Sequence, residues 1–253
     1  TVLADVARAL DKGIKPDYLT LSGSGEPTLY SRTGELIRAL NAAHSIPVAV
    51  ITNGSLLCRR DVQDDLLEAA LVMPSLDAGT GRTWEKVNRP HPSLTYDHMV
   101  DGIVRFAGRY RGRLWIEILL VGGTDVQSEV EALLPHMRAI APEKIQLNTV
   151  VRPPAQSGVH AVSRADLERA AALLGPSCEI IAPFAGSGGE HNGAPLSDRQ
   201  IIETVGRHPC KLDELVAVLG VERERVEHAV RKLLAAGTLS EKKVTGTVFY
   251  DVR

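Results

Sequence analysis

The sequence predicts an α/β protein in which strand–helix repeats form a parallel, barrel-like sheet, followed by a small C-terminal helical domain. Three observations support this prediction. Short apolar segments alternate with amphipathic helical segments, polar clusters follow the apolar segments, and the composition changes over residues 183–196. We therefore expect a barrel domain at residues 1–182, a Gly/Pro-rich linker at 183–196 and a second domain at 197–253.

Each repeat pairs a predicted strand with a predicted helix. An opening helix covers residues 1–10, and apolar runs predict strands at residues 18–21, 48–51, 71–73, 114–121 and 144–151. Apolar side chains at helical spacing predict helices at residues 35–43, 62–70, 96–110, 129–140 and 164–174. Such alternation is typical of right-handed βαβ units around a parallel sheet.

Small and polar residues follow the carboxyl end of each predicted strand, at residues 22–27, 52–55, 75–79, 122–124 and 148–154. In barrels of parallel strands the chemistry takes place in the loops at this end. We therefore expect the ligand site there.

The C-terminal domain shows the spacing of a winged helix-turn-helix. Helices are expected at residues 197–208, 211–219 and 222–236, and a strand or short hairpin at residues 244–252, around Gly246, would form the wing. The third helix carries Arg223, Arg225, Arg231 and Lys232, interleaved with glutamates. Contact with nucleic acid and a protein-interaction or substrate-presenting role therefore both stay open.

The overall composition excludes several classes of protein. The formal net charge of −2 over 253 residues favours neither nucleic acid nor a membrane surface. No apolar run approaches the roughly 20 residues of a membrane span. The three cysteines, Cys58, Cys178 and Cys210, lie far apart, so we expect a cytoplasmic protein without disulfides or a membrane partner.

The most informative motif is Ser24-Gly25-Glu26-Pro27, after the first predicted strand. Glycines there allow the backbone to approach a ligand closely, and a carboxylate is suited to an ammonium group. The alternative is a tight strand-to-helix turn in which the glycines serve only the backbone geometry.

Four motifs at consecutive strand ends resemble those of the radical S-adenosylmethionine (SAM) superfamily, in the branch of Fe–S oxidoreductases related to wyosine-base synthases. They are Ser24-Gly25-Glu26-Pro27, Thr52-Asn53-Gly54, the segment from Ser75 to Gly79 with 88–92, and the segment from Leu147 to Pro154. The resemblance covers residues 1–181 and implies a partial (βα)6 TIM-like barrel.

The resemblance also implies a role in binding SAM for Ser24, Gly25, Glu26, Pro27, Asn53, Ser75, Asp77, Glu117 and Asn148. The Gly25 backbone and Glu26 would hold the ammonium group, Ser75 and Asp77 the ribose or carboxylate, and Asn148 the adenine. Glu117 would point into the barrel. The alternatives are a helix N-cap or loop cap for Asp77, a salt-bridged strand carboxylate for Glu117 and a simple turn at Asn53. Arg89 and Arg152 are candidates for contact with an anionic substrate.

The superfamily's Cys-x-x-x-Cys-x-x-Cys motif, whose thiolates hold a [4Fe–4S] cluster, does not occur in this sequence. The three cysteines are expected to be ordinary thiols, so this chain has no predicted metal ligands. Because a helix begins at the first residue, we expect the first strand and the cluster loop to precede Thr1.

Taken together, the resemblance implies an enzyme that cleaves SAM reductively at a [4Fe–4S] cluster to modify a tRNA base, a small molecule or a peptide, with flavodoxin or ferredoxin as electron donor. The alternative is a degenerate barrel that senses a ligand and regulates through a DNA-binding winged helix.

Overall fold

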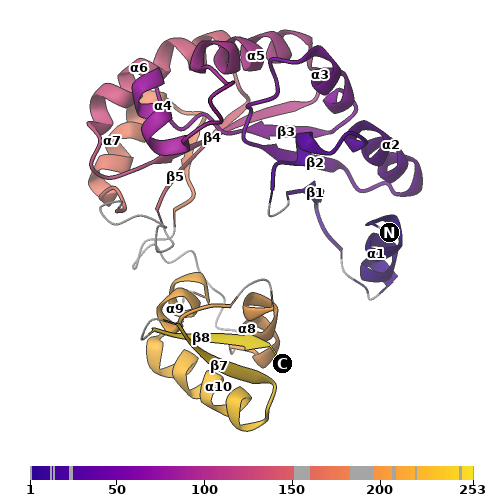
Figure 1. Ribbon diagram of the computed structural model, residues 1–253, viewed down its shortest axis with the longest axis vertical. Coiled ribbons are helices and arrows are strands. Elements are labelled where there is room, and N and C mark those ends of the chain that lie inside the picture. The colour runs from indigo at the N-terminus through magenta and orange to yellow at the C-terminus, as the bar shows by residue number, and fades with distance from the viewer. Residues whose placement is uncertain are drawn as a thin grey trace. The chain divides into compact units, whose positions relative to one another are not determined.

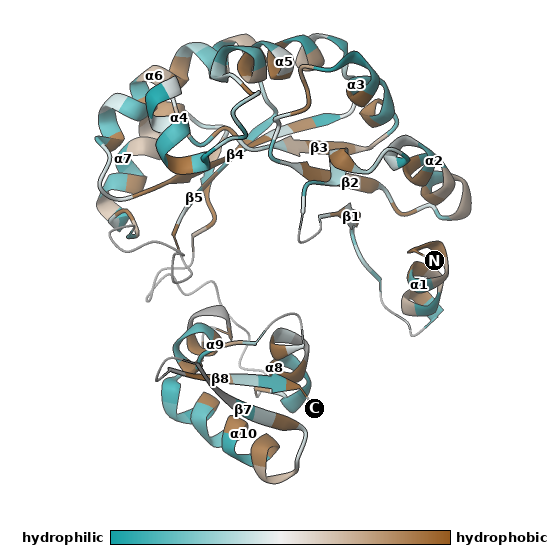
Figure 2. Cartoon of the chain, viewed as in Figure 1, coloured by the Kyte–Doolittle hydropathy of each residue, from teal (hydrophilic) through white to brown (hydrophobic). Residues whose placement is uncertain are grey.

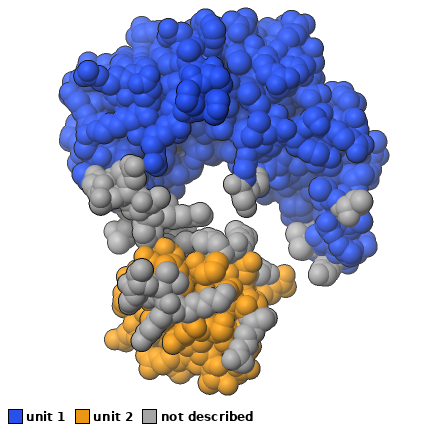
Figure 3. Space-filling view, viewed as in Figure 1, with its two compact units in different colours: residues 1–150, 154–181 blue, residues 151–153, 182–253 orange. Residues whose placement is uncertain are grey.

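The computed structural model describes residues 2–11, 13, 15–22, 25–150, 160–182, 196–206, 209–219, 221–244 and 247–252. The chain divides into two compact units (Figure 3), unit 1 with residues 1–150 and 154–181 and unit 2 with residues 151–153 and 182–253. Each unit is described by itself. The predicted linker, apart from Leu196, lies outside the described residues, and the domain boundaries at residues 182 and 197 stay predictions.

Unit 1 contains a six-stranded sheet in which every neighbouring pair of strands is parallel and the strands follow chain order. The predicted parallel α/β sheet is therefore confirmed. The strands are β1 (Leu19–Leu21), β2 (Val48–Thr52), β3 (Leu71–Pro74), β4 (Arg113–Leu120), β5 (Lys144–Thr149) and β6 (Cys178–Ile180).

Unit 1 also contains the helices α1 (Val2–Asp11), α2 (Thr33–Ala43), α3 (Arg60–Leu66), α4 (Gly81–Asn88), α5 (Tyr96–Arg109), α6 (Val126–Ile140) and α7 (Arg164–Leu174), with a short 3₁₀ helix η1 (Pro27–Leu29). Helices such as α2, α3, α5, α6 and α7 follow the outer side of this sheet, while α1 lies beside its β1 edge and buries no residue (Figure 1). The helices are banded brown and teal in Figure 2, as amphipathic helices on a sheet should be.

The two faces of the sheet differ most clearly in β4 and β5. Alternate residues, such as Ile116 and Ile118 of β4 and Ile145 of β5, are buried with the helix residues Ile103 and Phe106 in the hydrophobic core. The residues between them are only partly buried. Because successive side chains of a strand point to opposite faces, the second set lies on the face of the sheet away from this core.

Helix α4 was not expected from the sequence, which predicted only the helix at residues 96–110 between the third and fourth strands. Its N-cap is Thr80, whose hydroxyl accepts a hydrogen bond from Thr83 N, and only Trp84 is buried. The carboxylate of Glu129 on α6 accepts hydrogen bonds from Gly79 N (3.0 Å) and the Thr83 hydroxyl, so α6 fixes the start of α4.

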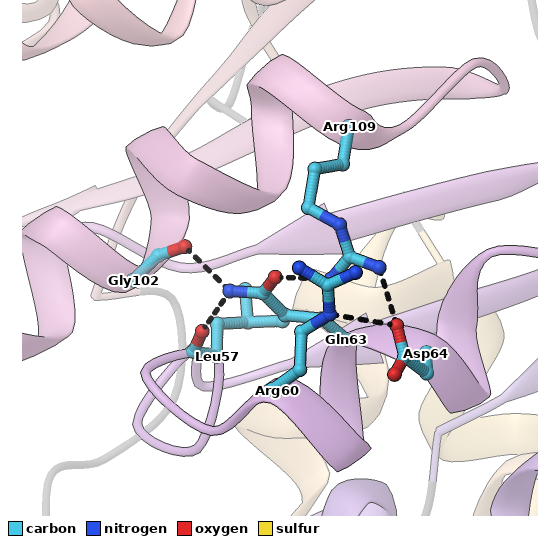
Figure 4. Close-up of polar contacts among 6 residues, drawn as sticks. All are labelled: Leu57, Arg60, Gln63, Asp64, Gly102 and Arg109. Carbon is cyan, nitrogen blue, oxygen red and sulfur yellow. Dashed lines mark hydrogen bonds and ion pairs between the residues drawn. The ribbon is translucent and has the colours of Figure 1, made fainter.

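A polar network joins α3 to α5 (Figure 4). The side-chain amide of Gln63, which is 3% exposed, donates to the carbonyl oxygen of Leu57 at 2.7 Å and approaches that of Gly102 at 3.5 Å. Arg109 donates to the Gln63 side-chain oxygen at 2.6 Å and also binds Asp64. Gln63 is thus a buried polar residue with its hydrogen bonds satisfied.

At the amino ends of the strands the charged side chains bind one another. Arg113 pairs with Glu143 at 2.7 Å and donates to the Tyr18 hydroxyl at 2.8 Å, and Lys144 pairs with Glu179 at 2.9 Å. The charged side chains named here therefore already have partners at this end of the sheet.

Unit 2 consists of three helices, α8 (Asp198–Val205), α9 (Leu212–Leu219) and α10 (Arg223–Ala235), and the antiparallel strands β7 (Leu239–Val244) and β8 (Thr247–Val252). The second strand lies within the predicted wing segment, but β7 begins five residues earlier than that segment. A separate core holds the unit together: Ile201, Val205, Cys210, Leu215, Val226, Ala229, Val230, Leu233 and Leu239. Its identity as a winged helix stays a prediction.

Candidate functional site

The motif after β1 is tied to the end of β2 through Glu26. One carboxylate oxygen, Oε1, accepts hydrogen bonds from the backbone and hydroxyl of Thr28 (3.0 and 2.7 Å) and from the Thr52 hydroxyl (2.5 Å). The other, Oε2, accepts from Asn53 N at 2.7 Å. Glu26 thereby caps η1, which begins at Pro27. Gly25 has open space at its Cα, and Ser24 lies outside the described residues.

Thr52 is a residue of this site that sequence reasoning did not single out. It is 2% exposed, and while its hydroxyl binds Glu26, its carbonyl oxygen accepts a hydrogen bond from Ser75 N at 2.9 Å. Thr52 therefore connects the ends of β1, β2 and β3. The available signal was its place as the last residue of a buried strand before Asn53-Gly54, where Gly54 adopts the positive φ of 73° that favours glycine.

Ser75, Asp77 and Glu117 come together where β3 meets β4. The Ser75 hydroxyl lies 3.4 Å from Glu117 Oε2, and Leu76 N donates to the carbonyl oxygen of Glu117 at 2.9 Å. Asp77 accepts hydrogen bonds from Leu119 N at 2.9 Å and from the Asn88 side chain at 2.6 Å. Asp77 thus joins β4 to the end of α4, while Thr80 provides the N-cap of that helix.

Glu117 and Asn148 lie on the partly buried face of the sheet. Glu117 is paired in register with Gln146, and Asn148 with Leu119 two pairs further along. The Asn148 side chain accepts a hydrogen bond from Thr149 N at 2.9 Å. In the described part of the chain Glu117 has no ion pair, so the salt bridge considered as its alternative role is not present there.

The electrostatics of the site are dominated by Asp77. Burial raises the pKa of its carboxyl to about 6, and the nearby Glu117 adds to this rise. The hydrogen bonds from Asn88 and Leu119 N favour the ionised form and oppose the rise, but burial prevails.

This shift predicts a pH dependence of stability. Because the pKa of Asp77 is higher in the folded chain than the ordinary 3.8, the folded state loses stability relative to Asp77→Asn as the pH rises from about 4 through 6. We expect a loss of about 1–3 kcal/mol, measured as urea-unfolding free energies at several pH values. Asp125→Asn is the control, because hydrogen bonds from Ser128 lower the pKa of Asp125 and no such loss should appear above pH 4. Equal pH profiles of the unaltered chain and Asp77→Asn would refute this assignment.

The three cysteines do not form a cluster site. Cys58 follows β2, where its thiol binds the carbonyl oxygen of Ser55, Cys178 begins β6, and Cys210 lies in the core of unit 2. Burial raises the pKa of the Cys178 thiol to about 11, which disfavours the thiolate that iron requires. Among the described residues no three His, Cys, Asp or Glu side chains come together as metal ligands would.

Of the two arginines considered for substrate contact, Arg89 follows α4 in a left-handed backbone conformation (φ 46°, ψ 62°), and Arg152 lies outside the described residues. An arginine in this conformation is uncommon and worth a functional explanation.

Most of the cationic side chains on α10 are already paired. Arg223 binds Asp213 and Glu227, Arg231 also binds Glu227, and Lys232 binds Asp198. Arg225 is the remaining cation of the four that sequence analysis named. The described contacts thus leave little unpaired positive charge on this helix for phosphate.

No family model matches the chain. Among curated proteins, GTPase Obg of Brachyspira hyodysenteriae is 31% identical over 254 residues, which are 99% of this chain and 37% of that protein. A UPF0026 protein of Methanocaldococcus jannaschii is 27% identical over 93% of this chain and 74% of its own length. A UPF0026 protein of Helicobacter pylori is 32% identical over 60% of this chain and 50% of its own length. The chain therefore spans about a third of the first relative and half of the last.

Solved structures similar to this chain are radical SAM enzymes. TYW1 with a lysine–pyruvate adduct bound has a TM-score of 0.53 at 18% identity, over 68% of this chain and 57% of that one. A radical SAM methyltransferase from Sphaerobacter thermophilus also has a TM-score of 0.53, at 20% identity, over 72% and 55%. A domain of pyruvate-formate lyase-activating enzyme from Bacteroides vulgatus has a TM-score of 0.52 at 18% identity, over 64% and 97%. The α/β fold of this chain is thus that of radical SAM enzymes.

None of the helices formed by the described residues combines the length and the apolar character that crossing a membrane requires.

Proposed function

We propose that unit 1 is the SAM-binding part of a radical SAM enzyme. The observation that supports this most strongly is Glu117. It is a carboxylate on the partly buried face of the sheet, near its carboxyl end, and the 3.4 Å contact with the Ser75 hydroxyl is its only side-chain hydrogen bond among the described residues. The carboxylates at the opposite end pair with Arg113 and Lys144. Glu117 is therefore an under-used acceptor at the end of the sheet where barrels of this type bind ligands.

The residues present fit SAM. This molecule carries an ammonium group, a sulfonium group, two ribose hydroxyls and an adenine, which need acceptors and a cradle of backbone groups. Glu117 offers a carboxylate for the ammonium or a ribose hydroxyl, and Asp77 and Ser75 extend the same polar edge. Asn148 lies on the adjacent strand β5, paired in register with Leu119 of β4. When bound, SAM supplies the adenosyl group on which radical SAM chemistry depends.

Within this proposal Glu26 takes a positioning role. Its carboxylate oxygens accept four hydrogen bonds from the protein, so contact with the SAM ammonium would come mainly from the backbone around Gly25. Ser24, Pro27 and Asn53 belong to the same pair of loops and stay proposed contacts.

The residues of this chain do not fit the [4Fe–4S] cluster, because the three cysteines lie in separate places and one of them lies in unit 2. We therefore derive no reaction step through a cluster. The proposal for these residues is to bind SAM, to orient it and to exclude water. The substrate, whether a tRNA base, a small molecule or a peptide, and a flavodoxin or ferredoxin as electron donor, belong to the proposed whole enzyme.

The proposal predicts that the unaltered chain binds SAM and that Glu117→Gln weakens this binding at least tenfold, because a charged acceptor becomes a neutral amide. Isothermal titration calorimetry with SAM up to about 1 mM covers the usual range of enzyme affinities. Glu131→Gln, on the exposed surface of α6, is the matched control and should bind as the unaltered chain does. A chain that binds no SAM, or equal affinities for the Glu117 variant and the control, would contradict the proposal.

A further inference from the structure

A second ligand site adjoins the strand ends. A cleft of about 520 Å³ lies between the loops after β1 and β2 and the segment that includes α4 and the residues after it. Its volume falls within the roughly 300–1,000 Å³ of small-molecule sites. One part of its lining is apolar and comprises Leu29, Leu56, Trp84, Pro90, Leu94 and Met99. Leu29 is 71% exposed, so apolar surface is available to a ligand.

The described lining of the cleft carries one cation, Arg89, and one carboxylate, Glu26. The oxygens of Glu26 accept hydrogen bonds from Thr28, Thr52 and Asn53. Among the described residues no hydrogen bond or ion pair engages the Arg89 guanidinium. The cleft therefore presents a guanidinium that no described residue pairs with, while the oxygens of its carboxylate are held by hydrogen bonds from other residues. His91 lies beside Arg89 and binds Ser93.

The position of Arg89 is fixed by its neighbours. Asn88, which also lines the cleft, donates a hydrogen bond to Asp77 at 2.6 Å and so holds the end of α4 against β4. Arg89 then turns the chain with φ 46°, and the ring of Pro90 fixes the φ angle of the following position. A residue before proline ordinarily prefers an extended backbone, so this left-handed conformation is imposed by the surrounding structure.

We propose that this cleft binds an anionic small molecule with an apolar body, and that Arg89 anchors the phosphate or carboxylate of that molecule. Guanidinium recognises both anions through paired hydrogen bonds. Asn88 lines the cleft and binds Asp77, so the two sites are adjacent. The claim that this anion is the substrate of the enzyme rests on the proposed function. The claim that the cleft binds an anion does not.

The test uses Trp84, one of the two tryptophans of the chain. In a Trp115→Phe background the fluorescence of Trp84 reports ligands in the cleft. The probes are AMP against adenosine, and phenylacetate against phenylacetamide. We expect at least one anion to bind tenfold or more tightly than its neutral counterpart. The pair that shows this difference indicates whether the cleft prefers a phosphate or a carboxylate. Calorimetry on the unaltered chain provides the same comparison without the Trp115 substitution.

Arg89→Gln should abolish the preference for the anion, because it removes the charge and keeps a side chain of similar backbone preference. Arg82→Gln, on α4 but outside the lining of the cleft, is the matched control and should keep the preference. Equal binding of charged and neutral probes, no binding of any probe, or an unchanged preference in Arg89→Gln would overturn the inference. SAM affinity measured in Arg89→Gln separates the two proposals: Arg89 is not among the proposed SAM contacts, although Glu26 and Asn53 belong to both the cleft and the proposed SAM site.

Discussion

Gly79→Ala is expected to destabilise unit 1 by about 3 kcal/mol, because a methyl group at this position has no room. A Cβ there would lie 2.5 Å from the carbonyl oxygen of Glu129 and 2.6 Å from the Cβ of Ala132, both on α6. The nearest of these atoms belongs to the backbone of a helix, so relief requires that α6 move away from the loop after β3. Chemical unfolding followed by circular dichroism measures the loss.

Gly81→Ala is the matched control, two residues further along. A Cβ at that position lies 3.5 Å from the Cβ of Tyr96, which is ordinary contact, and Gly81 begins α4. Alanine is a better helix former than glycine, so we expect unchanged or slightly higher stability. Similar losses in both variants would show that the close approach of Gly79 to α6 is not the cause.

Gln63→Leu is expected to cost about 2–4 kcal/mol, although leucine has a similar volume and an apolar surface. The substitution leaves the carbonyl oxygen of Leu57 without its side-chain donor and removes the acceptor of Arg109 (Figure 4). An unsatisfied buried polar group costs roughly 1–3 kcal/mol, more if charged. The free energy of unfolding in urea provides the measurement.

Arg60→Ala tests the exposed part of the same network. Arg60 bonds to Asp64 at 3.2 Å, but the two side chains are 72% and 51% exposed. Surface ion pairs of this kind contribute little, so the change should stay within about 0.5 kcal/mol. A loss as large as that of Gln63→Leu would mean that the network depends on its exposed charges and not on the buried amide.

Strands β1 to β5 were predictable because burial leaves a strong local signal. Residues 48–51 form an unbroken apolar run because nearly every residue of β2 is buried. The bounds of β4 differ from the predicted strand by a single residue at each end. Parallel order then follows from the alternation with helices.

Helix α4 and strand β7 escaped prediction because neither carries such a signal. Only Trp84 of α4 is buried, so no apolar stripe marks the helix, and its start is fixed by Glu129, far along the chain. Strand β7 contains Ser240, Glu241 and two lysines, and its conformation depends on pairing with β8. Such contacts depend on the tertiary structure, which a local pattern does not contain.

The sequence predicted which strand ends form the candidate site, but not the hydrogen bonds between the residues there. The sequence places Glu26 and Asn53 after successive strands, yet nothing in it shows that the carboxylate of one binds the backbone of the other at 2.7 Å. In the same way, the link from Asp77 to Asn88 depends on α4, which was not foreseen. The spacing of residues in the sequence locates the loops, but only the tertiary structure shows which side chains are already hydrogen-bonded to other residues.

At position 89 the residue that best suits the left-handed backbone differs from the residue that the proposed ligand requires, so thermal stability and ligand binding favour different side chains. Glycine or asparagine would adopt φ 46° with less strain than arginine. A laboratory selection for heat resistance alone would therefore enrich those residues at this position and discard the guanidinium group of the cleft. A selection that also demands ligand capture should retain arginine and recover stability elsewhere in the chain.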